Sequence, residues 1–340
     1  MDLPFSVLLI LGAGAAAFAA TGLLLSWLKA RTILDHPNER SSHAAPTPKG
    51  GGIAVIAVLL GVWVVIAMDR GAGPVATWAV PAIAFILACI SWIDDLRGLS
   101  PLARLTAQAG AVATTLAFVP GPVVFFGGLL PPVADTVAAG LLWVWFINLY
   151  NFMDGVDAIT GVETATIGLG IALIAFLAGL EPGFILYGLS AAAVAIGFLA
   201  WNRPPAKIFL GDVGSVPLGY LMGLVLLALS AEGQGPSALI VSLYYLTDAT
   251  VTLFRRALRG EKVWQAHHQH FYQRGLERGL DHGAVTRAIA RANILLVALA
   301  GVAAMGRIFP AFVGAGITVL FLLAYLSGWA GTQGRDKPPA

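Results

Sequence analysis

The chain has 340 residues, of which 58% are hydrophobic and only 11% are charged. A soluble domain carries about 25% charged residues and cannot hide this much apolar surface, so the composition excludes a soluble globular protein and predicts an integral membrane protein. The net charge of +2 is too small to indicate a nucleic-acid partner. The single cysteine, Cys89, excludes an internal disulfide and a cysteine metal cluster.

Apolar stretches long enough to cross a bilayer follow one another along the chain. A transmembrane helix needs about 20 apolar residues. By that criterion the sequence predicts eleven spans, near residues 4–28, 51–67, 75–93, 102–120, 133–150, 158–179, 183–201, 213–231, 236–254, 286–306 and 310–329. The expected fold is all-α and polytopic. It comprises one transmembrane catalytic domain over residues 1–330 and a short polar tail at 331–340.

The distribution of basic residues predicts the orientation of these spans. With eleven spans, alternate loops lie on opposite sides of the membrane, and only Arg70 and Arg307 fall on the side that is poor in lysine and arginine. Basic residues favour cytoplasmic loops, so the rich side is predicted to be cytoplasmic. The N-terminus is then expected outside the cell and the C-terminus in the cytoplasm.

Five polar segments are predicted to meet at the cytoplasmic face of the membrane. They lie in the loops 29–50, 94–101, 151–157, 202–212 and 255–285. The loops on the other side are short and chemically plain. This asymmetry predicts an active site that faces the cytoplasm.

Five aspartates stand in or beside these loops, at positions 94, 95, 154, 157 and 212. Carboxylates at the edge of the hydrocarbon are costly unless they are paired, hydrated or bound to a metal. Such oxygen ligands suit Mg²⁺, which takes one or two carboxylates plus substrate phosphates. Basic side chains nearby are placed to hold phosphate oxygens: Lys49, Arg97, Arg104, Arg203 and Lys207. Together these groups predict phosphoryl-transfer chemistry.

Simpler interpretations stay open for single motifs. The pair Asp94–Asp95 alone is typical of a solvated helix cap, and HHQH at 267–270 of a solvated loop or a transition-metal site. Capping explains NLYNFMDGVD at 148–157 less well, because its four polar groups exceed what one helix end can use. Asp248 is interpreted as a structural polar contact, with a sixth site carboxylate as the alternative.

Two other functional classes are compatible with a polytopic chain that contains buried acids. A secondary transporter would place the acids near the membrane midplane on broken helices. An intramembrane hydrolase would need a nucleophile with a base at depth. Both are disfavoured, because the acids cluster at one face and all six histidines lie in loops.

Five ordered motifs resemble those of the polyprenyl-phosphate N-acetylhexosamine-1-phosphate transferase family. They are HPNERSSHAAPTPKGGG, WIDDLRGLSPLARLTAQ, NLYNFMDGVD, KIFLGDVGS and AHHQHFYQR, between about residues 35 and 275. The resemblance implies a Mg²⁺-dependent enzyme of the bacterial cytoplasmic membrane, with Mn²⁺ as the alternative ion. It implies undecaprenyl phosphate as acceptor, a UDP-linked N-acetylated sugar as donor and UMP as a product. Membrane lipids are further expected partners, and whether the chain forms a homodimer stays open.

The resemblance also assigns roles to single positions. Asp94 and Asp95 match the pair that positions or deprotonates the lipid phosphate, and the histidines match a loop that contacts the donor. The residues implied are, for catalysis, Asp94, Asp95, His267 and His270; for the metal, Asn151 and Asp212; and for substrate binding, Lys49, Arg97, Asn148, Asp154, Asp157, Lys207 and His268.

Three departures from the family pattern favour one branch of it. Arg97 and a glycine follow the aspartate pair where the muramoyl-pentapeptide branch has a lysine, Gln269 interrupts a histidine triplet, and Ala158 replaces a glycine. We therefore expect the branch that starts O-antigen or other surface polysaccharides, with the peptidoglycan branch as the alternative. The basic segment 255–291 is predicted to close over the donor sugar, with a membrane-surface anchor as the simpler reading.

Overall fold

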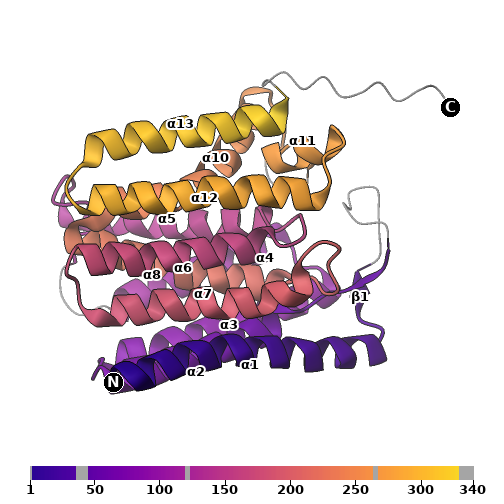
Figure 1. Cartoon of the computed structure of the whole chain (residues 1–340), viewed down its shortest axis with the longest axis horizontal. Coiled ribbons are helices and arrows are strands. Elements are labelled where there is room, and N and C mark those ends of the chain that lie inside the picture. Colours follow the sequence, from indigo (N-terminus) through magenta and orange to yellow (C-terminus); the bar gives the residue numbers. More distant parts are fainter. Residues whose placement is uncertain (1, 36–44, 119–122, 263–266, 329–340) are drawn as a thin grey trace.

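The computed structural model describes residues 2–35, 45–118, 123–262 and 267–328. They form a bundle of long helices that lie side by side, with α1 (Leu3–Ala30) and α13 (Ile308–Ser327) at opposite edges (Figure 1). The expected all-α, polytopic membrane fold is confirmed. Residues 36–44, the first half of the HPNERSSHAAPTPKGGG motif, and the predicted polar tail at 331–340 lie outside the described residues.

Eight further long helices complete the bundle: α2 (Gly52–Asp69), α3 (Val80–Arg97), α4 (Pro101–Phe118), α5 (Pro132–Phe152), α6 (Ile159–Leu177), α7 (Pro182–Asn202), α8 (Asp212–Leu229) and α12 (His282–Ala304). The shorter elements are the helices α9 (Gly235–Val241), α10 (Leu243–Leu258) and α11 (Phe271–Glu277), and the π-helical turns η1 (Val75–Ala79) and η2 (Ser230–Gln234). Two short strands, β1 (Leu34–Asp35) and β2 (Thr47–Pro48), pair in antiparallel fashion.

Within the described residues, nine helical segments are long and apolar enough to cross a membrane. The two predicted spans without a full counterpart among them are 102–120, now α4, and 236–254. The prediction of a single helix over 236–254 is wrong, because Ser242 separates α9 from α10. Both regions carry polar side chains that face other parts of the protein, which lowers their hydropathy. The total of eleven spans and their orientation stay predictions.

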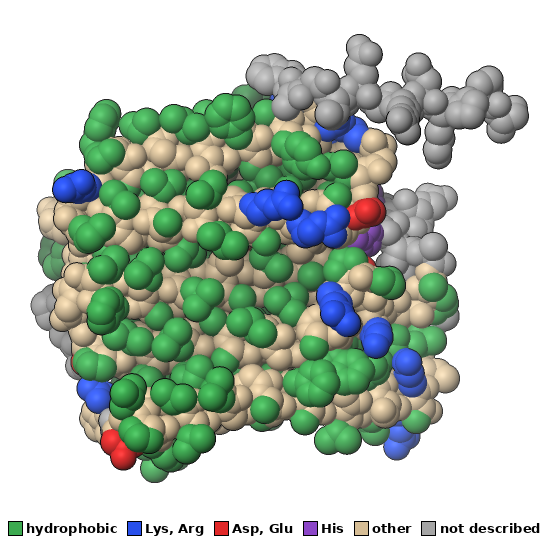
Figure 2. Space-filling view, in the orientation of Figure 1, with side chains coloured by type: hydrophobic (Ala, Val, Ile, Leu, Met, Phe, Trp, Pro, Cys, Tyr) green, Lys and Arg blue, Asp and Glu red, His purple; other side chains and the backbone are tan. Residues whose placement is uncertain are grey.

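The helices α6 and α8 lie at the centre of the bundle and are its most buried members, whereas α1 is the least buried. On one side α6 packs against α7 and α12, and α8 packs against α5 and α3. Apolar side chains cover the middle of the face seen in Figure 2, and basic side chains gather toward the end that carries the histidines. This division suits a bundle whose middle faces lipid and whose end faces water.

A close approach of two helix N-termini organises the end of the bundle that carries the aspartates. A Cβ atom on Gly52, the first residue of α2, would lie 2.2 Å from the Cα atom of Gly214 in α8. Backbone hydrogen bonds continue the contact, since Gly51 N and Gly52 N donate to Phe209 O and Leu210 O at 2.8 Å each. Glycine allows this contact because it has no side chain. The contact places Lys49 beside the start of α8.

Candidate active site

Two carboxylates and one guanidinium meet at a cavity of about 200 Å³ between α3, α4, α5 and α8. Arg104 Nε lies 2.7 Å from Asp94 Oδ2, and Arg104 Nη1 lies 3.8 Å from Asp212 Oδ2. The carboxyl groups of Asp94 and Asp212 lie within hydrogen-bonding reach of each other. Neighbouring carboxylates repel each other unless a proton or a cation lies between them or beside them. The cavity is therefore built to hold positive charge.

Asp95 plays a different part from its neighbour Asp94. Its side chain is only 2% exposed and lies 2.7 Å from Lys49 Nζ. Its two oxygens also accept hydrogen bonds from the backbone N–H groups of Asp212 and Val213, at 3.1 and 2.9 Å. The structure thus uses Asp95 to fix Lys49 and the first turn of α8. Burial opposes the charge on Lys49, but Asp212 and Asp95 together raise its pKa above the ordinary value.

The two asparagines of the NLYNFMDGVD motif line the same cavity. They stand three residues apart near the end of α5, so they share one face of that helix. Asn148 Nδ2 donates to Gln108 Oε1 at 2.5 Å, and Asn151 Nδ2 donates to Ser215 Oγ at 2.9 Å. In each asparagine the side-chain oxygen therefore points away from the hydrogen bond that its own Nδ2 makes.

Asp154 lies in the turn between α5 and α6 and is half-buried. Burial raises the pKa of Asp154 to about 7, and Asp212 adds to the rise, while a hydrogen bond with Thr160 opposes it. The electrostatic influence of Asp212, Lys49 and Asp95 on this group shows that Asp154 belongs to the same cluster of charges.

Asn148 is the predicted substrate-binding residue that lines this cavity, and three of the others lie clearly apart from it. Asp157 is engaged elsewhere, because its Oδ2 accepts from Ala206 N at 3.0 Å and its Oδ1 lies 3.2 Å from His282 Nδ1. Lys207 is exposed, with its Nζ 5.5 Å from the centre of the Trp201 ring. Arg97 is exposed at the end of α3. Arg104, one turn into the next helix, contacts the carboxylates instead.

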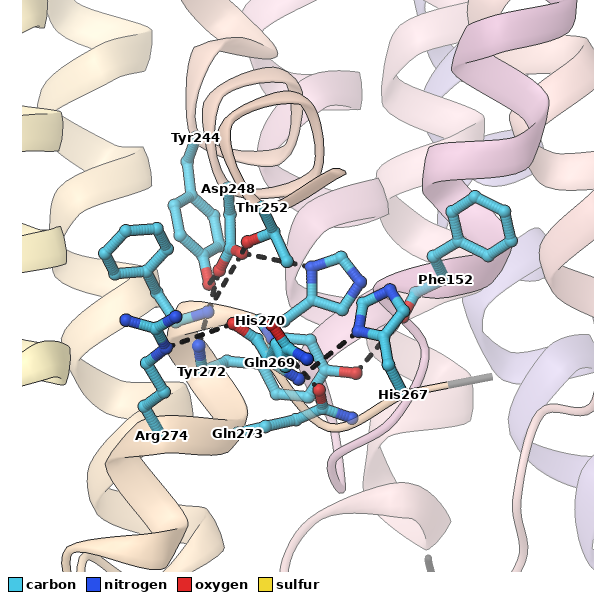
Figure 3. A network of polar contacts seen from close by, with 11 residues as sticks. Phe152, Tyr244, Asp248, Thr252, His267, Gln269, His270, Tyr272, Gln273 and Arg274 are labelled. Atoms are coloured by element: carbon cyan, nitrogen blue, oxygen red, sulfur yellow. Dashed lines mark hydrogen bonds and ion pairs between the residues drawn. The ribbon is translucent and has the colours of Figure 1, made fainter. Parts of the chain in front are cut away.

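The histidine segment 267–270 lies beside the C-terminal end of α5, and its network is drawn in Figure 3. The rings of His267 and His270 lie 4.8 Å apart between centres. The pKa of His267 is lowered to about 4, mainly by burial and also by the nearby His270 and Arg256. Nδ1 of His267 accepts from Gln269 N at 3.3 Å, so the proton of the neutral ring resides on Nε2 and can be donated to a ligand. Among the described residues, His268 Nε2 is buried without a hydrogen-bond partner.

The donor set fits a hard divalent cation. Asp94, Asp212 and Asn151 offer oxygen ligands at one cavity, and Mg²⁺ characteristically takes only one or two protein carboxylates and completes its shell with water and phosphate. In the part of the chain that the structure describes, no group of three or more His, Cys, Asp or Glu side chains could hold a metal by itself. The oxygen ligands at this cavity therefore fit a Mg²⁺ ion that shares its coordination with a phosphate group.

Several neighbours of the site were not assigned a role from the motifs. Gln108 and Ser215 hold the two asparagines, and Asp248 holds the histidine segment through His270 and two backbone N–H groups. Gln108 and Ser215 do stand within the quoted motifs, so their spacing was a usable signal. Asp248 was interpreted as a structural polar contact, but its partners could not be read from the sequence, because they lie 22 to 24 residues further along the chain.

Comparison with known proteins identifies the chain at the level of its family. The model of glycosyl transferase family 4 matches residues 77–230. A phospho-N-acetylmuramoyl-pentapeptide-transferase of Enterococcus hirae is 30% identical to this chain, over 67% of it and 76% of the relative. The chain belongs to glycosyl transferase family 4. The resemblance inferred from the five motifs is confirmed.

Other members of glycosyl transferase family 4 are also similar to this chain. A decaprenyl-phosphate N-acetylglucosaminephosphotransferase of Mycobacterium tuberculosis is 28% identical over 80% of this chain and 76% of its own length. The corresponding protein of Mycolicibacterium smegmatis is 32% identical over 68% of this chain and 62% of its own. The family match covers the cavity residues Asp94, Asn151 and Asp212, whereas Lys49 and the histidine segment lie outside it.

Proposed function

We propose that this protein transfers an N-acetylhexosamine 1-phosphate from a UDP-sugar to undecaprenyl phosphate and releases UMP. The carrying observation is the cavity in which Asp94 and Asp212 face each other beside Arg104. Neighbouring carboxylates need a cation, and a phosphate-bound Mg²⁺ supplies one. The cavity has apolar walls as well, including Leu87, which suit the first units of a lipid tail.

The residues of the cavity divide the work as follows. Asp212 and Asn151 would hold Mg²⁺, which when bound withdraws charge from the diphosphate and stabilises the leaving UMP. Asp94 faces the phosphate of the lipid and orients its attacking oxygen. Arg104, whose side chain is 41% exposed, can turn from the carboxylates to the phosphate oxygens when substrate enters.

The reaction that follows is a displacement at phosphorus. An oxygen of the lipid phosphate forms a bond to the sugar-linked phosphorus, and the bond between that phosphorus and the oxygen shared with UMP breaks. The bond from the sugar to its phosphate is untouched, so the anomeric configuration is retained. Lys49, tied to Asp95 at the start of α8, supplies a fixed positive charge beside the site.

The site is expected to serve a step of surface-polysaccharide synthesis such as the initiation of O-antigen, at the cytoplasmic face of the bacterial inner membrane. The second candidate is the peptidoglycan-type reaction, in which a phospho-N-acetylmuramoyl-pentapeptide is transferred. The relative from Enterococcus hirae carries that name and favours it. Arg97, Gln269 and Ala158 favour the first candidate, as do the mycobacterial relatives named for N-acetylglucosamine.

A comparison of two carboxylate variants tests the proposal. Purified protein is given undecaprenyl phosphate with UDP-N-acetylglucosamine or UDP-N-acetylmuramoyl-pentapeptide, and UMP is measured with and without a chelator. Asp212→Asn is expected to lower turnover at least about 100-fold. The control is Asp281→Asn, because Asp281 caps α12 at the same end and asparagine caps equally well. Full activity of Asp212→Asn would show that Asp212 does not bind the metal. UMP release at the same rate with and without undecaprenyl phosphate would exclude the proposed acceptor.

A further inference from the structure

The buried carboxylate of Asp248 collects an unusual number of hydrogen-bond donors. It lies in α10, is fully buried, and faces the histidine segment (Figure 3). Phe271 N donates to its Oδ1 at 3.0 Å and Tyr272 N to its Oδ2 at 3.3 Å. His270 Nδ1 lies 3.2 Å from Oδ1. The hydroxyls of Thr252 and Tyr244 complete the set at 3.3 Å each.

Three of these contacts determine where the histidine segment lies. The two N–H groups belong to the first turn of α11, which starts directly after His270, so Asp248 binds the free donors of that helix end. His270 Nδ1 faces the same carboxylate, so Nε2 is the ring nitrogen that points away from Asp248. Asp248 therefore fixes both the place of the His270 ring and which of its nitrogens faces outward.

A second contact joins the same helix to the NFMDG motif. Tyr272 Oη donates to Phe152 O, the carbonyl at the end of α5, at 3.1 Å. Burial raises the pKa of Tyr272 well above its usual range, so the hydroxyl keeps its proton. Gly155 leaves room for it, because a Cβ atom there would lie 2.2 Å from Tyr272 Oη. The start of α11 is thus held from two sides, by Asp248 in α10 and by the turn that carries Asp154.

We propose that Asp248 is a positioning residue, which acts through His270 and the first turn of α11 to set the histidine segment 267–270 against the catalytic end of α5. The kinetic consequence rests on the proposed function, in which this segment contacts the nucleotide-sugar donor. The mechanical consequence, that Asp248 holds the segment in place, does not. The two can therefore be tested separately.

The mechanical test is limited proteolysis of the detergent-solubilised full chain. Trypsin cleaves after arginine, and Arg274 lies in α11 with its Nε donating to Gln269 O at 3.1 Å. Asp248→Asn is expected to speed cleavage after Arg274 about tenfold, because α11 loses charge-assisted contacts. The matched control, Asp281→Asn, alters the cap of the neighbouring α12 and is expected to leave this rate unchanged. Equal rates in Asp248→Asn and the unmodified protein would overturn the proposal.

The kinetic test compares the two substrates. Asp248→Asn is expected to lower kcat/KM for the UDP-sugar about 10- to 100-fold, as the loss of a hydrogen bond to a charged group implies. The KM for undecaprenyl phosphate is expected to change less than about twofold, because the acceptor site lies at Asp94. A general structural defect would impair the kinetic parameters for both substrates to the same extent, and that result would overturn the positioning role.

A double-mutant cycle identifies the route of the effect. If Asp248 acts through His270, then His270→Ala costs little in the Asp248→Asn background, whereas independent sites give additive losses. Gly155→Ala provides a second variant that does not touch Asp248 and is expected to loosen α11 by displacing Tyr272. Additive losses in the cycle would contradict the proposal, as would a proteolysis rate in Asp248→Asn equal to that of the unmodified protein. Absence of lipid-dependent UMP release from the unmodified protein would count against the proposed function alone.

Discussion

At the scale of single residues, the site separates groups that look equivalent in the sequence. Asp94 and Asp95 are adjacent, yet one lines the cavity with Arg104 while the other is buried against Lys49 and the first turn of α8. Helix geometry explains this, because neighbouring positions are about 100° apart around the axis and so face different partners. The pair therefore combines a reactive carboxylate with an anchoring one.

The two arginines that follow the aspartate pair are predicted to differ in importance. Arg104→Gln is expected to lower kcat/KM for UMP release by about 10- to 100-fold, because the guanidinium contacts both cavity carboxylates. Arg97→Gln is expected to cost less, since Arg97 is exposed at the end of α3. Steady-state kinetics of the two variants measures the difference. A larger loss of kcat/KM in Arg97→Gln than in Arg104→Gln would instead support the substrate-binding role that the motif predicted for Arg97.

The raised pKa of Asp154 predicts how stability depends on pH. Its folded value of about 7 lies above the ordinary value, so the folded protein retains a proton that the unfolded chain releases. Between about pH 4 and pH 7 the free energy of unfolding should therefore fall as pH rises. Asp154→Asn cannot ionise and is expected to raise the thermal midpoint by a few degrees at about pH 8, with little effect near pH 4.

Thermal unfolding in detergent with a chelator present measures this effect, because a bound cation would itself favour the ionised carboxylate. The same substitution is expected to reduce activity, so stability and function should change in opposite directions. A lower midpoint for Asp154→Asn at about pH 8 would show that the ionised carboxylate stabilises the fold.

At the scale of helices, the site depends on the contact between the N-terminal ends of two helices, α2 and α8. The N-termini of α2 and α8 approach through Gly52 and Gly214, and the segment 49–52 bonds to the backbone of 209–210. The predicted loops were thus the right segments. Their pairing could not be read from the sequence, because it depends on contacts between residues more than 100 positions apart.

A glycine pair in α2 tests this arrangement. Gly52→Ala is expected to lower the thermal midpoint and to abolish most activity, because the new Cβ would overlap the backbone of Gly214 and push α2 away from α8. Gly61→Ala in the same helix is the control, since nothing lies within 4 Å of its added Cβ. The thermal midpoint and the rate of UMP release are measured in both variants. Equal behaviour of the two would show that the close approach is not needed.

Helices were easier to predict from the sequence than contacts between side chains. Most long helices were predictable because hydrophobic length alone defines a span, and α1 and α13 fall close to their expected bounds. The break at Ser242 was missed because no glycine or proline marks it, and apolar residues stand directly before and after it. The cavity residues were predictable from motifs, whereas the anchoring of Asp95 and Asp157 by backbone N–H groups required the folded chain.

At the scale of the whole molecule, the residues of the candidate site gather at one end of the bundle. The aspartates, Lys49 and the histidine segment lie together there, and the basic side chains seen in Figure 2 gather toward the same end. Phosphate groups of both substrates would meet positive charge at this end, and the prenyl tail can stay in the bilayer. The arrangement accounts for a water-soluble donor and a lipid acceptor meeting at one site.

The orientation in the membrane can be checked by labelling single cysteines in a Cys89→Ala background. Glu277 is exposed on α11 at the site end, and Glu232 is exposed in η2. Because basic residues favour the cytoplasm, Glu277→Cys is expected to react only with a reagent inside the cell and Glu232→Cys only with one outside. The reverse pattern would invert the predicted orientation and place the site outside the cell.

The most direct measurement of the central claim follows a labelled phosphorus atom. UDP-N-acetylglucosamine carrying ³²P in its sugar-linked phosphate is incubated with the protein, undecaprenyl phosphate and Mg²⁺. Transfer of the sugar 1-phosphate predicts that the label moves into the lipid fraction and that the released UMP is unlabelled. Label retained in UDP would indicate transfer of the sugar alone, and label released to water as sugar 1-phosphate would indicate hydrolysis. Either of these two results would contradict the proposed function.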